Sequence, residues 1–334
     1  MRSTLYALWA LSRPRLVPYV LCLLAVGMAW AHWDRALFLR NFSDLLVLSV
    51  GWIALHAGTL WLNAALDQDE GEVLFGEPVP LPPSLSAYGY AALLLGVIIS
   101  VQAGWIAGGC NAACAILAVL YSHPATVWKG HPIGGPLVNG VGYGLLSPMA
   151  GWSLAQVPPN PRTLIAWGLG MLGILSCYFA AQAFQHDEDA ARGYRTLVVT
   201  HGSAGALLAA RICLGLAYFF GMGMAAIGWF PRICLLAAPL WWWIDRGLLR
   251  WAQKPDGGAE ADARQFAQRV LIAVLVVLAL VFGEYLRASL AREPVAGLGT
   301  VAGHPADRPR LSSRGMLKWE ERTGKVLLTD PQTR

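Results

Sequence analysis

Charged side chains are scarce in this sequence. The chain has 334 residues, of which 13% are charged and 56% are hydrophobic, whereas about a quarter of the residues of a soluble domain are charged. Apolar runs of about 20 residues, long enough to cross a bilayer, recur between residues 16 and 287. This pattern excludes an ordinary soluble domain and predicts an all-α, polytopic integral membrane protein.

Other absences narrow the class further. No small-residue cleavage site follows the first apolar run, LVPYVLCLLAVGMAW, so we expect a retained helix and not a signal peptide. The six cysteines all lie in apolar surroundings, which predicts small core residues and not a disulfide framework. Cys110 and Cys114 have the spacing of a metal-binding pair, but no third ligand is near them in sequence. No motif for a nucleic-acid partner occurs.

Nine apolar segments are candidate spans. They cover about residues 16–32, 44–66, 86–107, 109–121, 135–155, 163–184, 204–228, 231–246 and 267–287. Lys and Arg are concentrated in the loops on the same side as the N-terminus, so we expect that side to be cytoplasmic. Residues 288–334 are polar, basic and rich in Pro and Gly, which predicts a largely disordered tail after a membrane domain of residues 1–287.

Acidic residues are rarer still, and they are clustered. Between Asp44 and Asp245 the chain has only eight, five of them within residues 67–77 directly after the second predicted span. The other three follow the sixth span and are Asp187, Glu188 and Asp189. Since an even number of spans separates the two clusters, we expect both on one face of the membrane.

A third polar loop, YSHPATVWKGHPIGG, follows the fourth span on that face and carries the lone Lys129. Clustered carboxylates repel one another unless a cation joins them, and Mg²⁺ prefers oxygen ligands, including substrate phosphates. On continuing helices Asn63 stacks one turn from Asp67, and Gln185 one turn from Asp189. The pattern favours a Mg²⁺ site. Solvated acids at helix ends stay an alternative, as does a transition-metal site that includes loop histidines.

Four stretches resemble motifs of the UbiA superfamily of intramembrane prenyltransferases. LSRPRLVPYVL resembles the family's Arg-Pro before the first span, and NAALDQDEGE its N-D-x-x-D-x-x-x-D motif. LYSHPATVWKGHPIGGPLVNGVGYGLLSPMAGW resembles the surroundings of its Y-S-x-P-P-x-x-x-K, and QHDEDAARGYRTLVVTHG its second Asp-rich motif with G-x-R-T-L. The resemblance covers most of residues 10–290 and implies a UbiA-like bundle of about nine transmembrane helices.

The resemblance also implies an activity: Mg²⁺-dependent transfer of a prenyl group from a prenyl diphosphate to a lipophilic acceptor, usually aromatic as in quinone, haem or chlorophyll pathways. It implies a site on the cytoplasmic side of a bacterial inner membrane. The implied catalytic residues are Asp67, Asp189, Lys129 and Tyr121. The implied diphosphate contacts are Lys129, Arg195 and Asn63. The implied metal ligands are Asn63, Asp67, Asp69, Gln185, Asp187 and Asp189.

The motifs depart from the family's pattern at several positions. Ala64, Gly71 and Gln185 stand where the family has Asp. A second hypothesis is therefore a catalytically degenerate relative that serves as a membrane scaffold or a lipid-binding protein. A third is a cation transporter. Intramembrane acids mark ion paths, but the clustered acids here lie at one surface and none is near mid-span.

Overall fold

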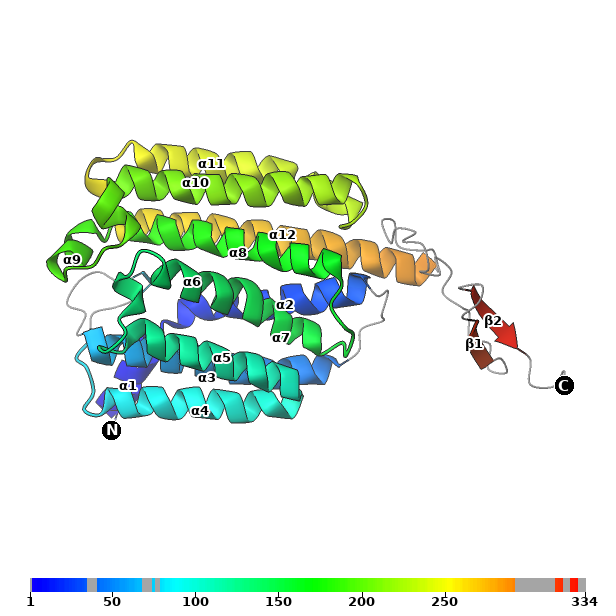
Figure 1. Ribbon diagram of the computed structural model, residues 1–334, viewed down its shortest axis with the longest axis horizontal. Coiled ribbons are helices and arrows are strands. Elements are labelled where there is room, and N and C mark those ends of the chain that lie inside the picture. The colour runs from blue at the N-terminus through cyan, green and yellow to red at the C-terminus, as the bar shows by residue number, and fades with distance from the viewer. Residues whose placement is uncertain are drawn as a thin grey trace.

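The computed structural model describes residues 2–34, 41–67, 74–75, 79–291, 316–320 and 325–329. Within this part of the chain the fold is an all-α bundle with one added hairpin (Figure 1). The helices are α1 (Arg2–Leu11), α2 (Val17–Asp34), α3 (Phe42–Asp67), α4 (Leu85–Ala103), α5 (Trp105–Ser122), α6 (Gly134–Val141), α7 (Ser147–Ser153), α8 (Pro161–Gln182), α9 (His186–Ala191), α10 (Leu197–Ala226), α11 (Ala238–Ala252) and α12 (Glu260–Ala291).

The hairpin pairs two antiparallel strands, β1 (Met316–Glu320) and β2 (Lys325–Thr329). Both lie within residues 288–334, the predicted tail, so this segment contains some regular structure. The division into a membrane domain of residues 1–287 and a tail stays a prediction.

All nine predicted spans fall on helical segments. Seven helices of the described part are long and apolar enough to cross a membrane by themselves. The other two predicted spans, 135–155 and 231–246, are helical but interrupted. A π-helical turn, Gly142–Leu146, joins α6 to α7, and a 3-10 turn, Arg232–Ala237, precedes the 15-residue α11. The protein is an integral membrane protein, and its total of nine crossings stays a prediction.

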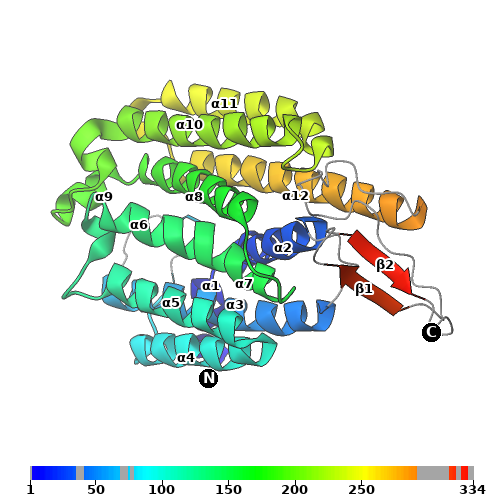
Figure 2. The same ribbon diagram turned by 45° about the vertical axis from the view of Figure 1, so that its right-hand side comes forward.

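The long helices lie roughly parallel and side by side in both views (Figure 2), and their buried residues form two main cores, each within one group of helices. One hydrophobic core joins α2, α3, α4, α5 and α7 through residues such as Leu24, Trp52 and Leu62. A separate core joins α8, α10, α11 and α12 through residues such as Leu207 and Leu248. Two separate cores leave room for a cavity between the groups.

The outer surface of the bundle is apolar. Phe219 is 73% exposed, and Leu94, Ile98 and Leu275 are also exposed. A soluble monomer rarely exposes so much contiguous apolar surface, whereas hydrocarbon chains of a bilayer would cover it without cost. The exposed apolar side chains therefore agree with the membrane class predicted from composition.

Candidate active site

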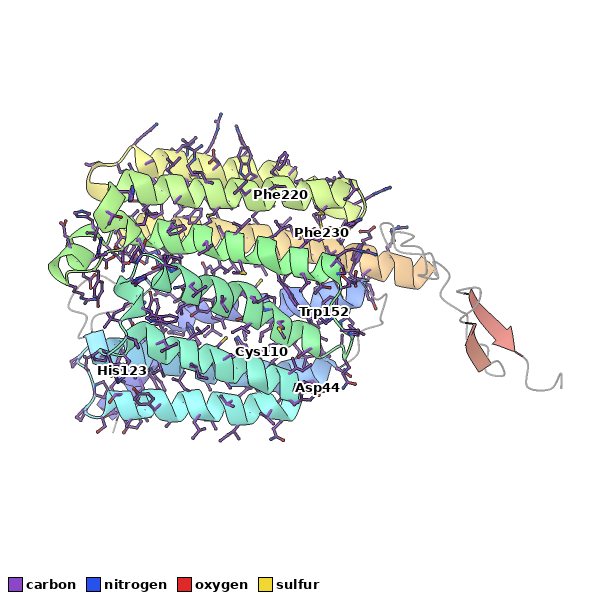
Figure 3. The ribbon with its side chains drawn as sticks, in the orientation of Figure 1. Asp44, Cys110, His123, Trp152, Phe220 and Phe230 are labelled. Carbon is purple, nitrogen blue, oxygen red and sulfur yellow. The ribbon has the colours of Figure 1, made fainter. Side chains whose placement is uncertain are left out.

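A cavity of about 660 Å³ lies between the two helix groups, within the usual range of ligand sites of about 300–1,000 Å³. Its interior is apolar and includes Trp30, Trp52 and Trp167. One end is polar and lies beside α9. His123, in the loop after α5, is at that same end of the bundle, whereas Asp44 is at the other end (Figure 3).

Five of the residues predicted from the sequence line this cavity together. Asn63 comes from α3, Tyr121 from α5, Lys129 from the 3-10 turn Trp128–Gly130, and Gln185 and Asp189 from the N-cap and body of α9. Ser122 donates a hydrogen bond to the Asn63 side-chain oxygen at 3.0 Å. The structure therefore brings parts of three separate sequence motifs to one place.

Backbone hydrogen bonds hold the two site loops against each other. The Arg195 amide donates to the Gly130 carbonyl at 2.8 Å, and the Tyr194 amide donates to the Asp189 carbonyl at 2.9 Å. Gly193 supplies the left-handed backbone, φ 70°, that reverses the chain after α9. Lys129 and Asp189 thereby occupy neighbouring positions although they are far apart in sequence.

The pKa values of two ionisable side chains at the polar end, Lys129 and Asp189, are shifted from their ordinary values. Burial, with Arg192 nearby, lowers the pKa of Lys129 to about 8, although Asp189 and Glu188 act in the opposite direction. Burial raises the pKa of Asp189, opposed by a hydrogen bond from Thr196 and by Arg192 and Lys129. The Thr196 hydroxyl donates to Asp189 Oδ2 at 2.7 Å. Perturbed groups that line a cavity are typical of a functional site.

Two predicted residues lie elsewhere. The Asp187 side chain is fully exposed, 2.9 Å from His186 Nδ1, and does not line the cavity. Arg195 is exposed and contributes only its backbone amide. These positions correct the predicted placement. Successive helical residues point about 100° apart, so α9 turns Asp187 outward when Asp189 faces inward.

Two further predicted ligands are not described at the side-chain level. Asp67 is the last residue of α3, but its side chain lies outside the described part of the chain. Asp69 lies wholly outside the described residues. Their roles as metal ligands stay predictions.

Two charged cavity residues, Arg13 and Arg192, were not predicted from the sequence, and a third, Glu188, was assigned only to the second acidic cluster. Arg192 Nη2 is 2.8 Å from Glu188 Oε1, one helical turn away. Helical spacing could have predicted that Glu188 and Arg192 face the cavity, because positions 185, 188, 189 and 192 share one face of α9. Nothing in the sequence predicts the left-handed backbone of Arg13, φ 46°, just before α2.

The segment Leu74–Phe75 is anchored at the same cavity. Leu74 lines it and accepts a hydrogen bond from Arg13 Nη1 at 3.3 Å. The Phe75 amide donates to Glu260 Oε1 of α12 at 2.9 Å, and its ring is 5.6 Å from the Tyr19 ring of α2. Phe75 has a φ of 58°, a strained conformation that persists only under strong surrounding contacts. Leu74 and Phe75, which lie within the first acidic cluster of residues 67–77, are thus fixed between α2 and α12.

The donor atoms at the polar end suit a hard divalent cation. Asn63, Gln185 and Asp189 offer only oxygen ligands beside the cavity, which is the chemistry that Mg²⁺ prefers. No group of three or more His, Cys, Asp or Glu gathers anywhere in the described part of the chain. A complete site would therefore need carboxylates from the acidic cluster that begins at Asp67.

Comparison with known proteins identifies the family. The most similar structures include a UbiA homologue from Archaeoglobus fulgidus bound to GPP and Mg²⁺, with 16% identity, a TM-score of 0.64, and 83% of this chain and 98% of that chain covered. A structure of digeranylgeranylglyceryl phosphate synthase has 16% identity, a TM-score of 0.60, and coverage of 86% and 100%. A UbiA homologue from Aeropyrum pernix K1 has 14% identity, a TM-score of 0.54, and coverage of 82% and 98%.

The TM-scores and coverages of these structures show a shared fold. A search of curated proteins gives no match. The sequence profile of the UbiA prenyltransferase family matches residues 16–266, most of the chain. The resemblance inferred from the four motifs is confirmed, and the protein belongs to the UbiA prenyltransferase family.

Proposed function

We propose that this protein transfers a prenyl group from a prenyl diphosphate to a lipophilic acceptor within the membrane. The observation that carries the proposal is the cavity, which joins a charged end at Lys129, Asp189 and Arg192 to an apolar interior. A prenyl diphosphate has the same division, with a polyanionic head and a hydrocarbon tail. The Archaeoglobus fulgidus relatives bound to GPP and to DMAPP with Mg²⁺ support the assignment.

Cationic side chains would bind the diphosphate. Lys129 and Arg192 face the cavity from two loops, and charge-assisted hydrogen bonds to phosphate oxygens are strong. Arg192 takes the place that the sequence suggested for Arg195. An anionic ligand would also favour the charged form of Lys129, which burial disfavours.

Asp189, Asn63 and Gln185 would hold Mg²⁺ from the second motif and α3, with Asp67 and Asp69 as the proposed ligands of the first acidic cluster. When bound, Mg²⁺ would neutralise the negative charge that develops on the departing diphosphate. Asp189 must be ionised to act as a ligand of Mg²⁺. Lys129 and Arg192 both favour its ionised form.

The transfer itself breaks the bond between the first prenyl carbon and the diphosphate oxygen. The allylic cation is then attacked by a nucleophilic atom of the acceptor, which forms the new bond and loses a proton. Tyr121 lines the cavity beside the polar end, where its ring can stabilise a cation by its π face. Apolar walls exclude water, which would otherwise capture the cation. We propose an aromatic acceptor, of the quinone, haem or chlorophyll type, and a site on the cytoplasmic face of a bacterial inner membrane.

The second candidate is a catalytically degenerate relative that binds lipid or serves as a scaffold. The observation in its favour is that Gln185, a neutral residue, occupies the cavity-facing N-cap of α9, and that Glu188 is already paired with Arg192. Both features reduce the negative charge available for Mg²⁺.

The deciding experiment is a titration of the purified protein with geranyl diphosphate, with and without Mg²⁺, followed by a transfer assay with aromatic acceptors. Geraniol, which has the tail without the diphosphate, is the control ligand. We expect binding that requires both Mg²⁺ and the diphosphate. Equal binding of geraniol, or binding that ignores Mg²⁺, would support the lipid-binding alternative.

A further inference from the structure

The outer surface of α11 and α12 carries a basic patch that the cavity does not use. We define it by Arg246, Arg250 and Arg269, with the rings of Trp242 and Trp243. The Arg246 guanidinium lies 3.8 Å from the Trp242 ring centroid, and that of Arg269 lies 5.2 Å from the Trp243 centroid. Arg246 and Arg250 are exposed, and Trp242 is 55% exposed. None of the five lines the cavity.

A glycine shapes the patch. Residues 243, 246, 247 and 250 share one face of α11 because of helical spacing. A Cβ atom at Gly247 would collide with Arg269 Nη1, so the missing side chain lets Arg269 lie across α11. Arg269 Nη1 then donates to the Trp243 carbonyl at 3.2 Å. Arg246 and Arg250 thus lie on the face of α11 that includes Gly247, over which Arg269 passes.

No carboxylate of the described residues neutralises the patch. Asp245, the acid nearest in sequence, is buried on the opposite face of α11, where both its oxygens accept from Arg211 of α10 at 2.7 and 3.1 Å. Arg246 and Arg250 form no ion pair within the described part of the chain. The three arginines of this surface thus have no carboxylate partner within the described part of the chain.

The position of the basic patch along the bundle indicates what kind of anion could pair with it. The C-terminal end of α11 lies at the same end of the bundle as α9 (Figure 1), and Arg246 is six residues before that end, or about 9 Å at 1.5 Å per residue. Apolar side chains such as Trp241 and Leu249 are exposed around the patch, as expected of a surface that a bilayer covers. Arginine near hydrocarbon is costly unless it is paired, and Trp is enriched where headgroups begin.

We propose that the basic patch binds the headgroup phosphate of an anionic phospholipid. Arg246, Arg250 and Arg269 donate charge-assisted hydrogen bonds to the phosphate oxygens, while Trp242 and Trp243 contact the glycerol and the upper acyl chains. Basic sites between transmembrane helices are known to suit such headgroups. This site is independent of prenyl transfer, so it would exist in an active enzyme and in a degenerate relative alike.

The test uses the full-length protein in uncharged detergent, titrated with phosphatidylglycerol or phosphatidylcholine and read by Trp fluorescence and by native mass spectrometry. We expect saturable binding of phosphatidylglycerol, and at least tenfold weaker binding in the double variant Arg246→Gln/Arg250→Gln. Lys254→Gln is the matched control. It removes one positive charge near the same end of the bundle, but Lys254 is already paired with Asp262 at 2.6 Å, so affinity should not change.

A second variant separates site geometry from net charge. Gly247→Ala keeps every charge and suits a helix, yet it displaces Arg269, so it should weaken phosphatidylglycerol binding severalfold while leaving the helical content unchanged. Equal affinity for the two lipids in wild type would overturn the proposal, as would unchanged phosphatidylglycerol binding in the double variant. Displacement of the lipid by millimolar inorganic phosphate would show a free-anion site instead.

Discussion

Each end of the bundle holds an acidic side chain within the fold, but the surroundings of the two differ. At the end away from α9, Asp34 is 1% exposed. Its Oδ2 accepts from Asn160 at 2.7 Å, and Arg162 Nη1 lies 3.8 Å from its Oδ1. At the end that carries the candidate site, Asp189 is only half-buried and faces a cavity with Lys129.

The difference shows how a structural charge can be told from a functional one. Asp34, Asn160 and Arg162 fix the end of α2 to the start of α8, and none of them lines the cavity. Asp189 has one oxygen held by Thr196 and adjoins open space. The comparison predicts that substitutions at the two ends will separate stability from activity.

The largest effect is expected at the site. Asp189→Ala and Asp67→Ala should each lower the rate of prenyl transfer by at least about a hundredfold, because they remove transition-state charge stabilisation. Turnover of a prenyl diphosphate, measured on folded protein, is the test. Rates equal to wild type in both variants would remove these residues from the proposed reaction.

At the opposite end, Asp34→Ala should leave transfer per folded molecule unchanged but lower stability by about 3 kcal/mol, because it leaves Arg162 buried without its charged partner. Denaturant unfolding in detergent measures the loss. If Asp34→Ala abolished transfer while unfolding were unaffected, the proposed separation between the two ends would be wrong.

A pH profile should distinguish the site from the structural end. The pKa of Lys129 is lowered to about 8, so its positive charge is present below pH 8 and lost as the pH rises. Affinity for a prenyl diphosphate should fall by up to about tenfold per pH unit above that value, less to the extent that the ligand itself holds the proton. Lys129→Arg should remove this dependence, since arginine stays charged. A profile identical in wild type and variant would assign the titration to another group.

Gln185→Asp adds a carboxylate at the cavity-facing N-cap of α9. In a working enzyme it should reduce the Mg²⁺ concentration needed for half-maximal transfer by about tenfold, which corresponds to about 1.4 kcal/mol of site affinity. Gln185→Asn is the neutral control. An unchanged Mg²⁺ requirement in an active enzyme would place residue 185 away from the metal, and no turnover in either form would favour a degenerate relative.

The smallest effect is expected at the anchor of Phe75. Glu260→Ala removes the acceptor of the Phe75 amide, so hydrogen exchange of that amide should accelerate and the KM for prenyl diphosphate should rise about threefold to fivefold, equivalent to about 1 kcal/mol, with little change in kcat. Glu260→Gln keeps an acceptor and should restore both values. Arg264→Gln removes only the 3.6 Å ion pair of Glu260 and serves as control. Faster exchange with an unchanged KM would limit Glu260 to a structural role.

The sequence predicts the fold class well because long apolar runs have few alternatives in a bilayer. Motif order also identifies Asn63, Lys129 and Asp189 as neighbours, and the structure places all three at the cavity. Asp187 does not face the cavity because sequence spacing alone does not fix the rotation of the short helix α9. Arg195 follows that helix, and its backbone amide donates to the Gly130 carbonyl. Arg13 lines the cavity from a left-handed backbone position, and Glu260 holds the Phe75 amide through a tertiary contact. Neither feature leaves a periodic signal in the sequence.

The close contact between α2 and α7 limits how the size of the cavity can change. Gly27 of α2 lies against the Pro148 backbone of α7, and Gly151 of α7 lies against the Leu24 backbone of α2, with no room for a methyl group at either glycine. Since these helices meet backbone to backbone, they cannot move closer to reshape the chamber. A chamber for a longer or shorter isoprenoid would therefore require exchange of side chains such as Trp30 and Trp167, with both glycines kept.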